Sequence, residues 1–163
     1  MATLSVTDHN AHEVLPWLRG LLGDRLVAVA LFGSRARGDH RPESDWDLLI
    51  IAEGLPEGYM ERYRFFRCPG RPLLGTNISV MAKTPEEFEG YLPAIYLDIA
   101  LDAQVLYDPK GYAAERLSKL RRIIDKAGLY RERIGSGGFM WRWRDPPPFG
   151  KWSIEWDFLD RAG

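Results

Sequence analysis

The sequence reads Gly33-Ser-Arg-Ala-Arg-Gly-Asp-His-Arg-Pro-Glu-Ser-Asp-Trp-Asp-Leu-Leu-Ile50 between two apolar segments. These segments, residues 26–32 and 46–52, indicate two buried strands of one sheet. Asp45 and Asp47 are two residues apart where the second strand starts, so their carboxylates project from one face and Trp46 from the other. Two like charges held side by side need a cation.

Gly33 and Ser34 follow directly on the first of these strands. They remove side-chain bulk where the chain is expected to turn into a helix, so backbone amides and the Ser34 hydroxyl can meet phosphate oxygens. Phosphate donors beside a carboxylate pair suit phosphoryl-type chemistry, because magnesium prefers a few carboxylates together with substrate oxygens.

Gly33-Ser34 followed by Ser44-Asp45-Trp46-Asp47 resembles the glycine–serine and Asp-x-Asp signature of the DNA polymerase beta superfamily, particularly its minimal nucleotidyltransferases. The Gly-Ser-Arg-Ala-Arg-Gly form is the more specific half of the signature. The signature covers residues 33–50, and the order of strands and helices over residues 27–89 also fits the small sheet of that family.

The resemblance implies a role for each matching residue. Asp45 and Asp47 would hold two Mg²⁺ ions, and Gly33, Ser34 and Ser44 would bind a nucleoside triphosphate, with ATP as the expected nucleotide. The family transfers a nucleoside monophosphate to a hydroxyl and releases pyrophosphate. The acceptor hydroxyl belongs to a small molecule, a protein or an RNA, and the sequence does not distinguish among them.

Arg35 and Arg37 have two open interpretations. Either they add positive charge near the phosphates, or they form the solvated face of a short helix. The residue types and their spacing favour neither.

The sequence departs from the family pattern at one position. Members usually carry a third carboxylate on a neighbouring strand, a few residues ahead of a helix that starts as Thr84-Pro-Glu-Glu87 does. Counting back from Thr84 gives Ser79, which lacks the charge for a metal ligand and for a general base. Asp98 and Asp102 either supply a carboxylate from another direction or are ordinary helix residues, and we favour the second interpretation.

The expected order of elements is that of an α/β (α+β) fold with a small mixed sheet flanked by helices. We expect helices over 11–22, 57–67, 84–101 and 111–127, a short helix after Gly33, and further strands over 76–83 and 103–107. Tyr63 and Phe66 are expected on one face of their helix. Residues 1–134 are predicted to form the nucleotidyltransferase-like domain, and residues 135–163 an aromatic and proline-rich C-terminal extension that packs on it.

In this extension Phe139, Trp141 and Trp143 alternate with Met140, Arg142 and Arg144, as in a strand with one aromatic and one basic face. Such a surface can stack on and neutralise a nucleic-acid strand. We favour the alternative that the rings cover the edge of the core or form a homodimer contact, because aromatic side chains dominate burial. The sequence assigns Trp152, Trp156 and Phe158 to the same cluster.

Composition limits the expected partners and the expected cellular compartment. The formal net charge of -1 gives no strong attraction to nucleic acid or to an anionic membrane. Cys68 is the only cysteine, which excludes an internal disulfide and a cysteine-rich zinc site and fits a reducing compartment. With no membrane span or signal peptide expected, the chain is predicted to be cytoplasmic.

Two functional classes follow. The first is a magnesium-dependent nucleotidyltransferase, which the Asp45–Asp47 pair favours. The second is a nucleotide-binding module with little chemistry of its own, such as an antitoxin-like partner of a helical toxin protein, which Ser79 favours.

Overall fold

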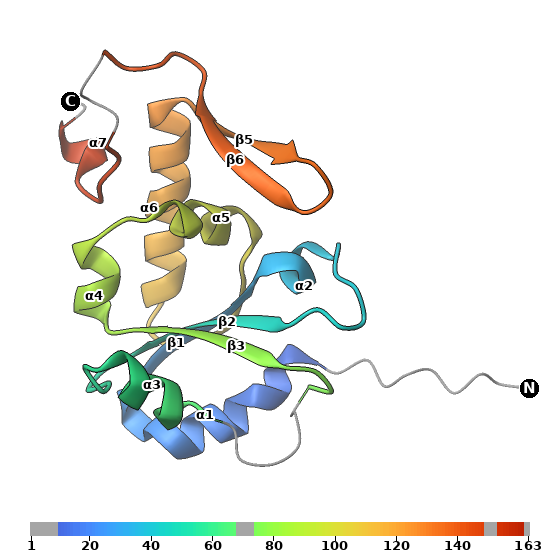
Figure 1. The fold of residues 1–163 in the computed structure, drawn as a ribbon. Coiled ribbons are helices and arrows are strands. Elements are labelled where there is room, and N and C mark those ends of the chain that lie inside the picture. The colour runs from blue at the N-terminus through green and yellow to red at the C-terminus, as the bar shows by residue number, and fades with distance from the viewer. Residues whose placement is uncertain (1–9, 68–73, 149–152, 162–163) are drawn as a thin grey trace, which may run out of the picture.

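A four-stranded mixed sheet forms the centre of the computed structural model, which describes residues 10–67, 74–148 and 153–161 (Figure 1). Its strands are β1 (Leu26–Phe32), β2 (Trp46–Ala52), β3 (Ile78–Lys83) and β4 (Gln104–Tyr107), in the spatial order β3-β2-β1-β4. β1 is antiparallel to β2 and to β4, whereas β2 and β3 are parallel. The predicted mixed sheet is therefore confirmed, and β3 is one of its two edges.

Helices cover both faces of this sheet (Figure 1). One face packs against α1 (Val14–Leu22) and α3 (Tyr59–Phe65), and the other against α4 (Pro85–Gly90), α5 (Ala94–Asp102) and α6 (Tyr112–Ala127). The short helix α2 (Gly33–Arg37) follows β1 directly. Single 3₁₀ turns, Ala11–Glu13 and Gly23–Arg25, flank α1, and α7 (Phe158–Arg161) is the last described element.

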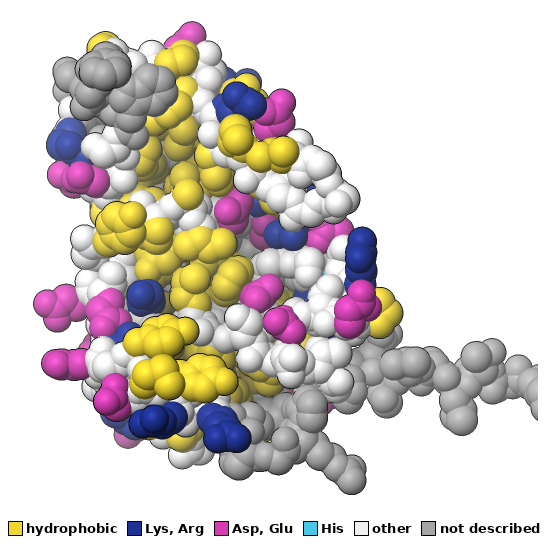
Figure 2. Space-filling model, in the orientation of Figure 1, with side chains coloured by type: hydrophobic (Ala, Val, Ile, Leu, Met, Phe, Trp, Pro, Cys, Tyr) yellow, Lys and Arg dark blue, Asp and Glu magenta, His cyan; other side chains and the backbone are white. Residues whose placement is uncertain are grey.

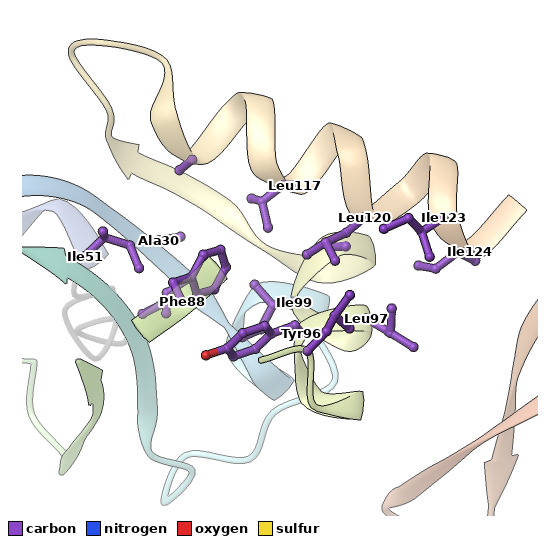
Figure 3. Packing of buried hydrophobic residues seen from close by; sticks show 14 of the residues in the cluster. Ala30, Ile51, Phe88, Tyr96, Leu97, Ile99, Leu117, Leu120, Ile123 and Ile124 are labelled. Atoms are coloured by element: carbon purple, nitrogen blue, oxygen red, sulfur yellow. The ribbon is translucent and has the colours of Figure 1, made fainter. Parts of the chain in front are cut away.

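Alternate residues of the strands enter two separate cores. Leu49 and Ile51 face the layer of α4, α5 and α6, where Phe88 packs among them (Figure 3). Leu48 and Ile50 face the layer of α1 and α3. Because both faces of the sheet are covered, β1 and β2 are apolar almost throughout.

The single helix predicted from Thr84 toward Leu101 is wrong, because the structure divides it into α4 and α5. Pro93 is the N-cap of α5, and a proline there cannot continue the preceding helix, since it has no N–H and its ring crowds the previous turn. The predicted start is confirmed. The Thr84 hydroxyl accepts from the Glu87 amide at 3.1 Å, and the Glu87 carboxylate accepts from the Thr84 amide at 3.0 Å.

The shared face predicted for Tyr63 and Phe66 is also wrong. Tyr63 is 63% exposed, whereas Phe66 is 6% exposed and belongs to the core beneath α1 and α3. Phe66 lies just after the last residue of α3, so the chain has left the helical path before its side chain turns inward.

The C-terminal part begins with a strand that the sequence did not predict. β5 (Leu129–Ile134) pairs antiparallel with β6 (Gly138–Trp143), and the expected boundary between residues 134 and 135 falls in their turn. β6 confirms the predicted alternation, with Phe139, Trp141 and Trp143 partly buried and Met140 exposed. Trp141 and Trp143 pack against the core that contains α6, which supports the interpretation that the rings cover the core.

Trp156 and Phe158 pack against the same core, and the Trp156 indole N–H donates to the Phe88 carbonyl at 3.0 Å. Trp152 and Cys68 lie outside the described residues. None of the helices in the described ranges is long and apolar enough to cross a lipid bilayer. The cytoplasmic location stays a prediction.

Candidate active site

The two carboxylates of the signature lie at the start of β2. Asp47 is level with Phe32 of β1 and with Ser79 of β3. Its side chain is half-buried and lies on the face of Leu49, as the strand alternation predicts. Trp46 points to the opposite face, where its indole N–H donates to the Leu74 carbonyl at 3.2 Å.

Burial raises the pKa of Asp47, and the neighbouring charge of Asp45 raises it further. A hydrogen bond from the Ser79 hydroxyl and the positive charge of Arg37 act in the opposite direction and lower that pKa. The raised pKa means that the surroundings resist a second negative charge beside Asp45. A bound cation relieves that resistance.

Gly33 is the contact point between the glycine–serine turn and the carboxylates. Its backbone has φ +74°, a left-handed conformation that favours glycine. A Cβ atom built on Gly33 would lie 2.2 Å from Oδ2 of Asp47. The turn therefore reaches the carboxylate only because the residue has no side chain.

Ser34 occupies the first turn of α2, immediately beside this contact. Its carbonyl accepts from the amides of Gly38 and Asp39 at 2.9 and 3.1 Å, which closes the helix. The amides of a first helical turn have no partner within the helix and point outward along its axis. Ser34 and these amides thus lie next to Asp47, and their contact with phosphate stays a prediction.

Arg35 and Ser44 both hold the loop that carries Asp45. The Arg35 guanidinium donates to the carbonyls of Ser44 and Pro42 at 2.9 and 3.1 Å and lies 4.3 Å from the centre of the Trp46 ring. The Ser44 hydroxyl accepts from the Arg41 amide at 2.9 Å. These contacts brace the loop, and the positive charge that Arg35 would add near the phosphates stays a prediction.

Arg37 is the cation held beside the carboxylate pair. Its guanidinium donates to Asp39 at 3.2 Å and to Asp102 at 3.3 Å, and it stacks 5.0 Å from the centre of the Phe139 ring. Asp39, two residues along the chain, and two distant elements, α5 and β6, thus fix its position, and Asp47 lies within reach of its charge.

Asp98 and Asp102 bind an arginine instead of completing the carboxylate pair. Arg131 of β5 donates to Asp98 at 3.1 Å and to both oxygens of Asp102, at 2.6 and 2.8 Å. These bonds hold the pKa of the Arg131 guanidinium above its usual value. Within the described ranges, no group of three or more His, Cys, Asp or Glu side chains is arranged to hold a metal ion.

The sequence did not predict these ion pairs, which join the C-terminal hairpin to α5 and to Asp39 in the loop after α2. Arg133 of β5 donates to Asp39 at 3.0 Å. The guanidinium carbons of Arg131 and Arg133 lie 4.1 and 4.8 Å from the centre of the Phe139 ring in β6. Hydrogen bonds from Arg133 and Arg37 lower the pKa of Asp39. Only the alternation around Phe139 hinted at this contact, because the acidic partners are tens of residues away.

A cleft of about 990 Å³ opens beside Ser79 and follows the outer edge of the sheet. All residues from 76 to 83 contribute to its lining, and Tyr59 and Tyr63 of α3 line it as well. Figure 2 shows this side of the molecule, where apolar side chains gather over the middle and acidic ones lie beside them.

Comparison with known proteins identifies the family. The family model for the nucleotidyltransferase domain matches residues 15–107, which include every element that carries the candidate site. The chain belongs to the nucleotidyltransferase domain family. This placement confirms the resemblance to the DNA polymerase beta superfamily.

The nucleotidyltransferase chain has relatives in Methanocaldococcus jannaschii. It is 29% identical over 118 residues to "Putative protein adenylyltransferase MJ1305", covering 70% of this chain and 80% of that one. It is 53% identical over 36 residues to "Putative protein adenylyltransferase MJ0141", covering 22% of this chain and 36% of that one.

Two solved structures share the fold of this nucleotidyltransferase. One is a toxin–antitoxin with AMP-PNP, with a TM-score of 0.52, 15% identity, and coverage of 72% of this chain and 91% of that one. The other is a variant of the toxin–antitoxin MntA-HpeT, with a TM-score of 0.50, 12% identity, and coverage of 72% and 92%. At these identities the likeness concerns the fold alone.

Proposed function

We propose that this nucleotidyltransferase is a magnesium-dependent adenylyltransferase that moves AMP from ATP to a hydroxyl group of a protein. The observation that carries the proposal is the contact of Gly33 with the half-buried Asp47 beside Asp45, which joins a phosphate-binding turn to a carboxylate pair. The names of the two archaeal relatives support AMP as the transferred group and a protein as the acceptor.

The residues present fit magnesium. Asp45 and Asp47 offer carboxylate oxygens from one face, which is the ligand chemistry that this ion prefers. The pKa of Asp47 is raised by burial and by Asp45, so a divalent ion offsets a cost that the protein already bears. Two carboxylates suffice where phosphate oxygens and water complete the coordination. When bound, magnesium neutralises charge on the reacting phosphates.

The chain's own residues bind and orient the nucleotide in this proposal. Ser34 and the first amides of α2 hold phosphate oxygens, Ser44 keeps the Asp45 loop in place, and Arg37 adds positive charge beside the pair. The acceptor oxygen then forms a bond to the α-phosphorus, and the bond from that phosphorus to the bridging oxygen breaks. Pyrophosphate leaves with the electron pair, and the hydroxyl proton passes to water.

We also propose that residues 1–134 form the catalytic unit and that residues 135–163 pack on it. Trp141, Trp143 and Trp156 support this arrangement because they pack against the core that contains α6, and Phe139 lies 5.0 Å from the Arg37 guanidinium. The extension then acts as a brace for Arg37.

A second candidate function is a nucleotide-binding partner subunit with slow or no transfer of its own. Ser79 favours it, because it stands level with Asp47 at the position of the family's third carboxylate. A serine there hydrogen-bonds to Asp47 but supplies neither a charge nor a base. A partner of the antitoxin kind would need only the nucleotide site.

The test is the double variant Asp45→Asn with Asp47→Asn. Its magnesium-dependent ATP binding is measured by calorimetry, and pyrophosphate release is measured with and without acceptors. We expect both to disappear while the fold survives, because removing two repelling charges costs little stability. The control is Asp24→Asn with Asp125→Asn, which removes the same charge from two exposed positions. Magnesium-dependent affinity that persists in the first variant would contradict the assignment of the site.

A further inference from the structure

The cleft beside Ser79 follows one strand and not a cluster of loops. Eight consecutive residues, from Thr76 to Lys83, line it, and the strand among them, β3, pairs only with β2 among the described strands. A cleft that exposes a strand edge over such a length presents backbone groups as well as side chains.

The hydrogen bonding shows which backbone groups point into the cleft. The Trp46 amide donates to the Asn77 carbonyl at 2.9 Å, so the alternate residues Asn77, Ser79 and Met81 direct their backbone groups toward β2. Ile78, Val80 and Ala82 direct theirs outward. Arg62 confirms this direction, because its guanidinium donates to the Ala82 carbonyl at 3.1 Å.

Arg62 covers only the far end of this edge. It also forms a two-pronged pair with Glu87, at 2.7 and 2.9 Å, which anchors it at the end of β3. The outward backbone groups of Ile78 and Val80 flank Ser79, which is level with Asp47. That stretch is long enough for a partner strand to form a short ladder.

The side chains around the cleft suit a peptide. Tyr59 and Tyr63 of α3 line the cleft while 83% and 63% exposed, which is unusual for rings of that size unless a partner covers them. The lining carries three cations, Arg62, Arg67 and Lys83, against the carboxylates of Glu57 and Glu87. Arg67 and Lys83 lie in this lining besides the Arg62–Glu87 pair, and their positive charge favours an acidic residue in the part of the segment that lies away from Asp45 and Asp47.

We infer that the acceptor protein binds as an extended segment that adds a strand to the outer edge of β3 and brings its hydroxyl to Asp47. This inference rests on the proposed function and names the form of its acceptor. A residue paired with Ser79 across the new ladder would project from the same face as Ser79 and Asp47. Ser79 lines the cleft and is level with Asp47, so a segment bound along β3 would pass beside this carboxylate.

Val80→Pro tests the inference with a matched control. Proline removes an outward N–H on an edge strand, so the ladder between β2 and β3 stays intact. Val80→Ala loses a similar amount of packing and keeps the N–H. The probe is a library of ten-residue peptides, each with one Tyr, Ser or Thr and one acidic residue, incubated with magnesium and ATP labelled at the α-phosphate.

We expect the wild type and Val80→Ala to label the same peptides. For Val80→Pro we expect the kcat/KM for peptide to fall about tenfold or more, while the affinity for ATP is unchanged. Equal labelling by the two variants would overturn the inference. So would labelling of small molecules or folded surfaces while every peptide stays unlabelled. Failure of the proposed function looks different, because the wild type would then transfer AMP to nothing at all.

Two measurements keep the test decisive if Val80→Pro does not fold or if transfer fails. The best labelled peptide is methylated at one backbone nitrogen at a time. If the peptide forms a ladder with β3, methylation at every second residue is expected to reduce its labelling. Peptide capture by the double variant Asp45→Asn with Asp47→Asn requires no chemistry. Losses without a period of two, or no capture, would overturn the inference.

Discussion

Replacing Gly33 by alanine displaces the site without removing any functional group. The new Cβ would lie 2.2 Å from Oδ2 of Asp47, whereas real Cβ contacts stay beyond 3.0 Å, so the carboxylate or the turn must move by about 0.8 Å. A misplacement on the order of 1 Å costs about 10²-fold in rate when reacting groups must be aligned. We therefore expect Gly33→Ala to lower the rate of AMP transfer at saturating ATP about 100-fold.

The same substitution also strains the backbone, and a control separates the two effects. A left-handed alanine costs about 1–2 kcal/mol, which for a chain of this size lowers Tm by roughly 2–8 °C. Gly38 has φ +83°, against +74° for Gly33, and a Cβ on Gly38 has nothing within 4 Å. Gly38→Ala should therefore bear the same backbone cost without the clash and keep its activity.

The assay combines thermal unfolding with release of labelled pyrophosphate or transfer of labelled AMP. The reasoning is refuted if the two alanine variants melt alike and also transfer AMP alike, because the contact between Gly33 and Asp47 would then have no part in the chemistry. A Gly33→Ala protein that fails to fold, beside a folded Gly38→Ala, would show instead that Asp47 cannot yield at all.

Two further predictions concern the surroundings of the site. Ser34→Trp should abolish ATP binding measured by calorimetry, because a ring at the first turn of α2 fills the space for phosphates; binding of wild-type strength would place the phosphate contact elsewhere. Arg131→Gln should lower the free energy of unfolding by about 3 kcal/mol, because it leaves the carboxylates of Asp98 and Asp102, 23% and 8% exposed, without their main partner. Arg142→Gln, which breaks an exposed pair with Glu132, should cost no more than about 1 kcal/mol, and equal losses in denaturant titrations would contradict this account.

The sequence predicted the central sheet because burial on both faces forces continuous apolar strands. The resemblance to the polymerase beta superfamily pointed to Ser79, because its members carry a third carboxylate a few residues ahead of a helix that starts as Thr84-Pro-Glu-Glu87 does, and the structure sets Ser79 level with Asp47. The strands and the start of this helix depend on contacts within a few residues or on the pattern of apolar residues. Such local signals can be read from the sequence without knowing how the rest of the chain packs.

The sequence did not predict the roles of the arginines. Arg35 binds carbonyl oxygens of its own loop, and carbonyl acceptors leave no trace in the sequence. Arg131 binds Asp98 and Asp102, which are about 30 residues away in the sequence. It lies on β5, and the polar composition of β5 gave no sign of a strand. Ion pairs between distant elements depend on how those elements pack, so they appear only once the packing is known.

Ser79→Asp tests whether serine at the third carboxylate position limits the reaction. The new carboxylate would face Asp47 directly and replace the hydroxyl that now lowers the pKa of Asp47. Without magnesium, a third like charge should raise that pKa further. A carboxyl whose pKa is raised by folding contributes stability at low pH that is lost as pH rises above its unfolded value of about 3.9. The variant should therefore melt below the wild type at pH 7, and the difference should shrink toward pH 4.

Magnesium and ATP should reverse this order of melting temperatures, because the added carboxylate then faces a cation. General-base assistance typically contributes about 10²–10⁴-fold, so basal AMP transfer by Ser79→Asp should rise visibly above that of the wild type and of the uncharged control Ser79→Asn. Asp98 accepts from Arg131 and from the Trp141 indole at 3.1 and 3.3 Å, so we do not expect it to act as the base in place of a carboxylate at position 79. A folded Ser79→Asp protein that binds magnesium and ATP but transfers no faster would mean that the serine is not what limits transfer. The second candidate function, a nucleotide-binding partner subunit, would then gain support, because adding the third carboxylate would not have increased transfer.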